Sequence, residues 1–319
     1  MQQTRPKCAL IVGAFGQDGH YLSNYLSAQG YSVVRAGRSR IEGHAGADSF
    51  DVLDPSVVAG LIGDLLPAEI YYLAAFHHSS EQEPPPLDAL LAESMSVHFG
   101  GLLNILQGVV TRSPASKVFL ASSALVFGEA LVSPQSEETP RLPTTPYGVS
   151  KVAAMGACEL YRRTHGIFAV SGILFNHESP RRNPSFVSRK IAIAAAKAAK
   201  GQAAELRLGA LDAQLDWSAA EDVVRAAHAM LQMQEPIDCV IASGQLHSVR
   251  EFARVAFDVV GLDYRDHVTQ DDAILHRPVT TVPRLGDPSR LRRATGFAPQ
   301  VSFEDMVCSM VRAEMDSAA

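Results

Sequence analysis

Short apolar runs alternate with longer amphipathic stretches along the first half of the chain. The runs are rich in β-branched and aromatic residues and predict strands at residues 8–12, 31–35, 70–74 and 117–122. Between them, apolar residues recur at helical spacing. Strands that alternate with helices predict a parallel, doubly wound sheet with helices on both faces. Such a sheet binds its ligands at the carboxyl ends of its strands, where we expect the chemistry.

The pattern becomes more helical in the second half. It predicts an alanine-rich helix at 191–200, a short strand around Leu206, a late sheet strand at 240–242 and mainly helix from Arg250. A chain of 319 residues also exceeds the usual size of one hydrophobic core. We therefore expect an α/β protein with a Rossmann domain and a smaller, mostly helical substrate domain. The Rossmann domain is predicted at 1–176 plus about 215–245, and the substrate domain at 177–214 plus 246–319.

Composition restricts the class of protein. The formal net charge of -6 disfavours a nucleic-acid partner, because such a partner requires a dense basic surface. By the sequence pattern, no segment is long and apolar enough to cross a bilayer, and the first residues lack a secretory signal. We expect a cytoplasmic protein without a membrane partner. Four widely spaced cysteines predict reduced core thiols and neither a disulfide nor a metal site: Cys8, Cys158, Cys239 and Cys308.

A basic cluster stands out in this acidic chain. Its members are Arg181, Arg182, Arg189 and Lys190. Such a cluster is expected of a pocket for a diphosphate. A solvated helix start explains the same charges equally well, so charge alone leaves both interpretations open.

A glycine-rich loop directly follows the first predicted strand and opens a helix. It has the pattern G-x-x-G-x-x-G, with Gly13, Gly16 and Gly19 as its glycines and Gln17 and Asp18 between the last two. Glycines allow the backbone to approach a pyrophosphate, which the amides of the helix N-terminus then attract. Because the motif lies between a strand and a helix, it predicts dinucleotide binding.

The end of the second strand indicates which dinucleotide is bound. An NAD enzyme places an acidic residue there, whereas residues 34–40 carry three arginines, which suits the extra phosphate of NADP. A solvated basic loop is the alternative. Asp51 follows the next strand pattern and is expected at the adenine edge or, nearly as readily, in a plain turn. Leu73 and Ala74, at the end of a further predicted strand, are also expected to contact the cofactor, and so are Tyr147 and Lys151.

A tyrosine and a lysine lie one helical turn apart in Tyr147-Gly148-Val149-Ser150-Lys151. The charge of Lys151 is expected to lower the pKa of the phenol, so that Tyr147 exchanges a proton with a carbinol at neutral pH. Ser123, at the end of the preceding strand, is expected to donate a hydrogen bond to the same oxygen. Together with the glycine loop, these residues predict hydride transfer at a hydroxyl or keto carbon.

These motifs together resemble the extended short-chain dehydrogenases/reductases. Several longer strings are similar to one branch of them, the GDP-mannose 4,6-dehydratases, and the similarity spans the whole chain. The strings are Gly16 to Gly19, Ile173 to Arg182, Phe186 to Ile191, Ile241 to Gly244, His247 to Phe252, Arg277-Pro278 and Gly286-Asp287.

The resemblance implies a cofactor, a substrate class and an assembly. It implies NADP in the glycine loop, with Arg38 near the 2′-phosphate, and homodimers or homotetramers. It also implies a GDP-sugar held by Asn176, Val187, Lys190 and Arg277. Lys190 and Arg277 would then pair with the diphosphate, which favours the pocket interpretation of the basic cluster.

The sequence departs from this branch at a catalytic position. Its dehydratases read Ser-Thr-Ser-Glu-Leu-Tyr-Gly after the catalytic strand, and their glutamate handles the proton at C5. Here Leu125 stands at that position within residues 122–128, and the string instead resembles that of nucleotide-sugar 4-epimerases. Leucine cannot carry a proton, so ordinary 4,6-dehydration is disfavoured. Leu215 similarly replaces an arginine that the dehydratases carry near the diphosphate.

Three functions therefore stay open. The first is hydride transfer at C4 of a GDP-hexose or GDP-4-keto-6-deoxyhexose, by a reductase or a 4-epimerase. The second is a 4,6-dehydratase with a relocated acid, for which His77 or Glu129 is available. His77 or the neighbouring His78 would then face the sugar and move protons near neutral pH. The alternative is that both are plain loop histidines. The third is a catalytically silent NADP-binding partner protein, against which the intact Ser123, Tyr147 and Lys151 argue.

Overall fold

A seven-stranded sheet forms the centre of the computed structural model, which describes residues 6–38, 40–44, 50–76, 85–202, 205–271 and 282–317. The strand order is β10-β6-β5-β4-β1-β2-β3, and all neighbours are parallel except β2 and β3. The strands are β1 (Cys8–Val12), β2 (Ser32–Gly37), β3 (Arg40–Glu42), β4 (Glu69–Tyr72), β5 (Lys117–Ala121), β6 (Ala169–Leu174) and β10 (Cys239–Ile241).

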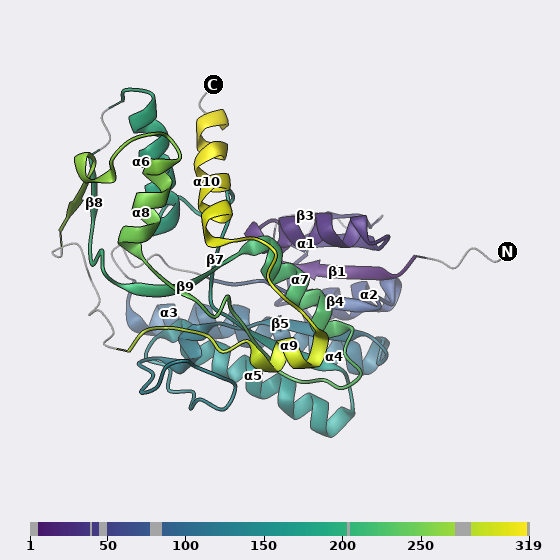
Figure 1. Cartoon of the computed structure of the whole chain (residues 1–319). Helices are drawn as coiled ribbons and strands as arrows, with labels where there is room; N and C mark the ends of the chain where they lie inside the picture. Colours follow the sequence, from purple (N-terminus) through teal and green to yellow (C-terminus); the bar gives the residue numbers. More distant parts are fainter. Residues whose placement is uncertain are drawn as a thin grey trace.

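Helices cover both faces of the sheet, so the predicted doubly wound Rossmann fold is confirmed (Figure 1). Apolar side chains of three helices pack on one face: α2 (Pro55–Leu65), α4 (Gly101–Arg112) and α5 (Pro146–His165). Three others pack on the opposite face: α1 (Gln17–Ala28), α7 (Ala220–Leu231) and α9 (Ser289–Thr295). The strand patterns predicted from the sequence correspond to β1, β2, β4, β5 and β10 within two residues at their ends.

The central strand β6 is absent from the sequence prediction, and so is the edge strand β3. Strand β3 has three residues, Arg40, Ile41 and Glu42, and pairs antiparallel with β2. A strand this short and this polar has no apolar alternation to reveal it. The hairpin matters because it turns the chain back beside the glycine loop.

A second layer of helices and short strands lies at one end of the molecule (Figure 1). Trp217 packs on Phe252 and Phe303 there, with ring centroids 5.1 and 5.9 Å away. Its helices are α6 (Val187–Ala199), α8 (Val249–Asp258) and α10 (Phe303–Ser317). Its strands are β7 (Asn176–Glu178), β8 (Leu206–Leu208), β9 (Gln214–Ala219), β11 (Leu246–Ser248) and β12 (Val268–Gln270). The predicted alanine-rich helix and the strand around Leu206 are thus present.

The assignment of residues to two domains stays a prediction. One feature differs from it: α9, which we expected in the substrate domain, packs its Leu291 into the core on the sheet. All four cysteines are free, and burial raises the pKa of Cys158 and Cys239 to about 12.

One helical segment is longer and more apolar than the sequence pattern indicated. Residues Leu87–Arg112 comprise α3 (Leu87–Ser94), a π-helical turn, η1 (Met95–Gly100), and α4, and by length and composition they could cross a membrane. The sequence-based exclusion of such a segment is therefore wrong. In this fold Leu102, Ile105 and Leu106 of α4 are fully buried against the sheet, which accounts for the apolar composition of that part.

A buried carboxylate joins three segments near the carboxyl edge of the sheet. Asp216 on β9 accepts hydrogen bonds of 2.6 to 3.2 Å from Ser243, Gly244 and Gly286. Burial raises the pKa of Asp216, and these hydrogen bonds oppose that effect. The stretch before α9 is thereby held against β9.

Candidate active site

The glycine loop lies at the topological switch point of the sheet. From β1 the chain continues to β2 on one side and later returns to β4 on the other side of β1. Ligands of open α/β sheets bind in the crevice at this point. The loop between β1 and α1 therefore occupies the place that a dinucleotide requires.

Each glycine of the loop has a distinct steric reason. Gly13 has φ +88°, and a Cβ there would lie 2.6 Å from the amide nitrogen of Ala74. A Cβ on Gly19 would overlap the backbone of Ala14 at 2.5 Å. At Gly16, in contrast, a Cβ would meet nothing closer than 3.6 Å, so packing within the protein does not demand glycine there. An open glycine between two constrained ones fits the close approach of a pyrophosphate.

The first turn of α1 is tied to the segment after β6. Gln17 Nε2 donates to the carbonyl of His177, and the Ser179 hydroxyl donates to Gln17 Oε1. Asp18 Oδ2 lies 3.0 Å from Nε2 of His177. The predicted cofactor residues Gln17 and Asp18 thus also hold the cofactor loop to the start of the expected substrate segment.

The contact between Asp18 and His177 shifts the pKa of each group in the direction that favours its charged form. Burial by itself raises the pKa of Asp18, but the charge and hydrogen bond of His177, together with the hydrogen bond of Gln17 and the charge of Arg182, outweigh it, and the pKa is lowered. Burial by itself lowers the pKa of His177, but Asp18 reverses this, and the pKa is raised.

We expect His177→Asn to lower the free energy of unfolding more at low pH than at high pH. A histidine with a raised pKa in the folded state stabilises fully below its unfolded value of 6.5, and the effect is lost as pH rises through the folded pKa. Urea unfolding of both proteins at about pH 5.5 and about pH 9 measures the difference. The control is His165→Asn, an exposed position on α5. An equal loss of stability at both pH values would contradict the prediction.

Three arginines surround the β2–β3 hairpin. Arg38 is exposed in its turn. The guanidinium groups of Arg40 and Arg35 stack on the ring of Phe15 in the glycine loop, 3.9 and 4.8 Å from the ring centroid. Arg35 also forms a 2.7 Å ion pair with Glu42. Sequence reasoning selected Arg38 and missed the role of Phe15, which gathers the other two arginines beside the loop.

The remaining predicted cofactor residues lie at strand ends. Ala74 follows β4 and packs against Gly13, and the amide of Leu73 donates to the carbonyl of Val12. Asp51 accepts a 2.9 Å hydrogen bond from the amide of Leu53, which is the geometry of a turn. Of the two interpretations of Asp51, the turn is therefore present, and a contact with adenine stays a prediction.

The catalytic candidates meet at the carboxyl end of β5 and the start of α5. Thr145 caps α5 by accepting from the amide of Gly148, and Pro146 begins the helix, which places Tyr147 in the first turn. Lys151 is 1% exposed; its Nζ donates to the carbonyl of Ala121 at 2.7 Å and lies 5.4 Å from the centroid of the Tyr147 ring.

Ser123 directly follows this edge of the sheet and begins a 3₁₀ turn, η2 (Ala124–Phe127). Its Oγ accepts from the amide of Leu125 at 3.2 Å. Because an oxygen lone pair is used in this way, the hydroxyl proton remains available to donate to a substrate oxygen.

The prediction that Lys151 lowers the pKa of Tyr147 is wrong, because the surrounding protein raises this pKa. Burial raises the pKa of Tyr147 to about 12, the charge of Asp18 raises it further and Arg182 opposes both. Burial also lowers the pKa of Lys151 to about 7. The sequence showed the spacing of the two groups but not their desolvation, which dominates both values.

Leu125 occupies the position next to this catalytic pair. A Cβ on Gly148 would lie 2.6 Å from the Leu125 carbonyl oxygen, so η2 packs closely on the first turn of α5. Leu125 is half-buried. The backbone of a residue whose side chain has no proton to give therefore lies against the turn that carries Tyr147.

The expected substrate residues come from β7 and α6. Asn176 begins β7, and Val187 and Lys190 lie in the first turn of α6. Burial lowers the pKa of Lys190. His77 and Arg277, as well as His78, lie outside the described residues.

The basic cluster divides into different roles. Arg182 pairs with Glu178 at 3.1 Å and stacks on Phe186, and Arg189 pairs with Glu314 of α10. These two arginines therefore hold α6 to its neighbours. Lys190 stays the predicted diphosphate contact of the cluster.

Next to Leu215 the fold places another arginine. Leu215 and Arg284 are partners in an isolated parallel β-bridge. Arg284 was not singled out from the sequence, because the two residues are far apart in the chain.

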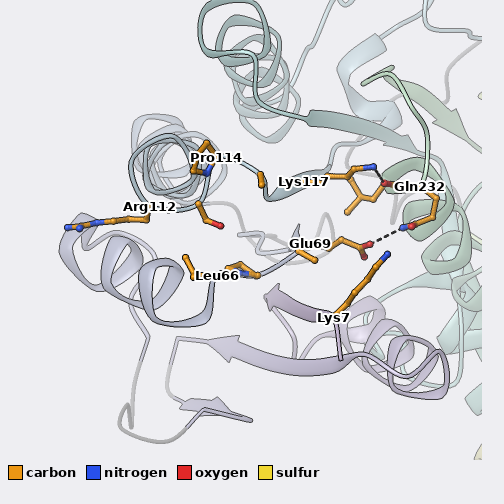
Figure 2. A pocket seen from close by; sticks show the side chains of 12 residues that line it. Lys7, Leu66, Glu69, Arg112, Pro114, Lys117 and Gln232 are labelled. Carbon is orange, nitrogen blue, oxygen red and sulfur yellow. Dashed lines mark hydrogen bonds between the residues drawn. The ribbon is translucent and has the colours of Figure 1, made fainter. Parts of the chain in front are cut away.

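A cavity of roughly 560 Å³ lies elsewhere, at the amino-terminal edge of the sheet (Figure 2). Glu69 accepts there from the hydroxyls of Tyr31 and Tyr71 and from the amide of Gln232, at 2.7 to 2.9 Å. Lys117 donates to the carbonyl of Leu231 at the end of α7. These polar groups thus serve the packing of strand starts and helix ends. None of the candidate residues that the structure describes lines the cavity.

Comparison with known proteins gives one consistent family. The family model described as GDP-mannose 4,6 dehydratase matches residues 10–310. The GDP-mannose 4,6 dehydratase of Cricetulus griseus is 35% identical and covers 97% of this chain and 92% of its own length. The GDP-mannose 4,6-dehydratase of Vibrio cholerae is 32% identical, with 97% and 94% covered.

Solved structures share the fold over nearly the whole chain. The structure of RMD from Pseudomonas aeruginosa complexed with NADPH has a TM-score of 0.83 at 25% identity and covers 98% of this chain and 99% of its own. The UDP-glucose 4-epimerase of Thermotoga maritima has a TM-score of 0.82 at 19% identity, with 98% and 100% covered, and shows the fold alone.

Proposed function

Because the chain belongs to the GDP-mannose 4,6-dehydratase family, we propose that it is an NADP-dependent enzyme that transfers hydride at C4 of a GDP-sugar. Its substrate is a GDP-hexose or a GDP-4-keto-6-deoxyhexose, and it acts as a reductase or a 4-epimerase. One observation carries this proposal: Ser123, Tyr147 and Lys151 are complete, whereas Leu125 stands where the family resemblance implies a proton-carrying glutamate.

The residues of the chain account for the proton half of the reaction. In reduction, the Tyr147 hydroxyl gives its proton to the C4 oxygen as the carbonyl carbon gains hydride, and in oxidation the phenolate takes the proton back. Ser123 donates a hydrogen bond to the same oxygen. Bound NADP(H) would supply or accept the hydride, and the cationic nicotinamide ring of its oxidised form would favour the tyrosinate that burial alone disfavours.

The residues present fit NADP. The open position at Gly16 leaves room for the pyrophosphate, and the N-terminus of α1 begins at this glycine. Arg38, Arg35 and Arg40 provide the positive charge that a 2′-phosphate requires. The relative from Pseudomonas aeruginosa, complexed with NADPH, supports the same cofactor.

We expect Arg38→Ala to weaken NADPH binding by about 10- to 100-fold and NADH binding by less than about threefold, because a charge-assisted hydrogen bond contributes about 1.5–3 kcal/mol. Only NADPH carries the phosphate that this side chain would contact. Fluorescence titration with each reduced cofactor gives the two dissociation constants. The matched control is Arg163→Ala, an exposed arginine on α5. Equal weakening of NADPH and NADH binding would show that Arg38 does not contact the 2′-phosphate.

For the sugar nucleotide, we propose contacts from Asn176, Val187 and Lys190 at the start of β7 and α6. Lys190 would pair with the diphosphate, and Arg277, outside the described residues, is proposed as its second cation. We also propose that Arg284 contributes positive charge beside Leu215, where the family pattern has an arginine.

A second candidate function is 4,6-dehydration of GDP-mannose. The relatives that are 32 to 35% identical over nearly the whole chain are named for this reaction, which favours it. It would need a replacement for the missing glutamate. Glu129 is exposed just beyond η2, and His77 is the other proposed replacement.

Assays of the purified protein distinguish these functions. It is incubated with NADPH and a GDP-4-keto-6-deoxyhexose, and separately with NADP and GDP-mannose. Stoichiometric oxidation of NADPH by the 4-keto sugar identifies a reductase. A C4 epimer formed from GDP-mannose without net change of the cofactor identifies a 4-epimerase. A 4-keto-6-deoxy product from GDP-mannose establishes the dehydratase instead. The absence of all three products would overturn the proposal and favour a silent NADP-binding partner protein.

We further propose that the protein acts in the cytoplasm as a homodimer or homotetramer. Large apolar side chains are exposed on the adjacent helices α3 and α5, which supports a subunit contact there. They are Leu87, Leu91, Val149 and Leu160.

A further inference from the structure

A fully buried histidine, His98, lies between the cofactor side and the catalytic helix. It belongs to η1, the π-helical turn between α3 and α4. Turns of this kind occur mostly as single insertions in α-helices and frequently at functional sites. The segment packs against α5, which carries Tyr147.

The two ring nitrogens of His98 have different partners. The backbone amide of Phe76 donates to Nε2 at 2.9 Å. Nδ1 lies 2.7 Å from the hydroxyl oxygen of Ser150. The Ser150 hydroxyl in turn donates to the carbonyl of Tyr147 at 2.9 Å. The hydroxyl proton is therefore used, and Ser150 accepts from His98.

These partners determine the tautomer of the ring. A nitrogen that accepts from an amide carries no proton, so the proton of the neutral ring is on Nδ1. The chain of donors runs from Phe76 through His98 and Ser150 to the backbone of Tyr147. In addition, the His98 ring meets the Tyr147 ring edge-on, with centroids 4.8 Å apart and planes at 73°.

We propose that His98 is a positioning residue for the reaction under "Proposed function", on which this inference rests. It joins Phe76, which follows the proposed cofactor residues Leu73 and Ala74 after β4, to the first turn of α5. It also restricts the ring of Tyr147 from the side. The proton donor and the cofactor segment are thereby held in one geometry, although His98 itself has both nitrogens engaged and moves no proton in the reaction.

The test compares two substitutions that differ in hydrogen bonding. His98→Gln keeps an acceptor for Phe76 and a donor for Ser150 in one amide group, whereas His98→Leu keeps neither. We expect His98→Leu to lower kcat by about 10- to 100-fold, as misplacement of reacting groups does, with KM for the sugar changed less than about threefold. His98→Gln is expected to recover most of kcat. The control His228→Leu removes a histidine that bonds to Tyr31 at the far edge of the sheet.

Two results would overturn the inference: equal kcat for His98→Leu and wild type, or equal loss of kcat in the leucine and glutamine variants. A coupling test adds Ser150→Ala, which should have little further effect in the His98→Leu background.

Amide hydrogen exchange separates this inference from the proposed reaction. If the wild type turns over no GDP-sugar, the proposed function fails, but exchange at Phe76 still reports on the contact. Faster exchange there in His98→Leu and near-wild-type exchange in His98→Gln support the bridge. Unchanged exchange in both variants would overturn it.

Discussion

Tyr147→Phe is expected to lower kcat for hydride transfer by about 10²- to 10⁴-fold, the usual loss when a general acid or base is removed. The ring stays in place, because its contact with the His98 ring needs no hydroxyl. The Lys151 hydrogen bond to Ala121 also stays, since it does not involve the phenol. Only the proton at the C4 oxygen is lost. NADPH affinity is therefore expected to change far less than kcat, because the ring keeps its packing.

Stopped-flow reduction and fluorescence titration measure these two quantities on the same preparation. The matched control is Tyr161→Phe, on the same helix, whose hydroxyl contacts Gln107. Full activity of Tyr147→Phe would remove Tyr147 from the mechanism. Unchanged function in the cell after the same substitution would favour a silent NADP-binding partner protein.

The charge beside Tyr147 also depends on pH. Burial lowers the pKa of Lys151 to about 7, so its ammonium charge beside Tyr147 is lost as pH rises through neutrality. A bound oxidised cofactor would favour both the tyrosinate and the neutral lysine.

The local parts of the site could be predicted from the sequence for physical reasons. Gly13 and Gly19 are required by contacts within a few residues or by a neighbouring strand end, so their spacing alone indicates the turn. Tyr147 and Lys151 share a helix face because four residues make about one turn. Both patterns express backbone geometry, which a sequence shows directly.

The parts that depend on distant contacts could not be predicted. His98 meets Ser150 across 52 positions and Phe76 across 22, and no spacing rule connects them. The pair Asp18 and His177 is separated by 159 positions. The direction of the Tyr147 pKa shift likewise depends on burial, which only the assembled fold determines. Leu125 is the opposite case, because its identity is visible in the sequence while its consequence depends on its place in η2.

The position of Leu125 in η2 makes Leu125→Glu the substitution with the largest expected change in reaction product. In dehydration, C4 is first oxidised, a base takes the proton from C5, and water leaves from C5 and C6. Hydride then returns to C6 and a proton to C5, so the net change is the loss of one water. Under the proposed function Tyr147 serves the redox step at C4, whereas Leu125 itself cannot carry the C5 proton.

We expect Leu125→Glu to form a 4-keto-6-deoxy product from GDP-mannose at least about 10²-fold faster than Leu125→Gln, since that is the usual contribution of a general base. Glutamine is the matched control because its side chain has nearly the same shape as that of glutamate and cannot act as a general base. Both variants place a polar group on a half-buried position, so loss of stability affects them alike. Mass spectrometry of the nucleotide sugar detects the lost water.

The two variants also decide between the candidate functions. If wild type already forms the dehydrated product at the rate of Leu125→Glu, another group carries the C5 proton, and the dehydratase function replaces our proposal. If glutamate and glutamine behave identically, the η2 position does not reach C5. A gain confined to glutamate would show that this chain has a complete redox site with one proton carrier removed, so that a single carboxylate separates hydride transfer at C4 from dehydration.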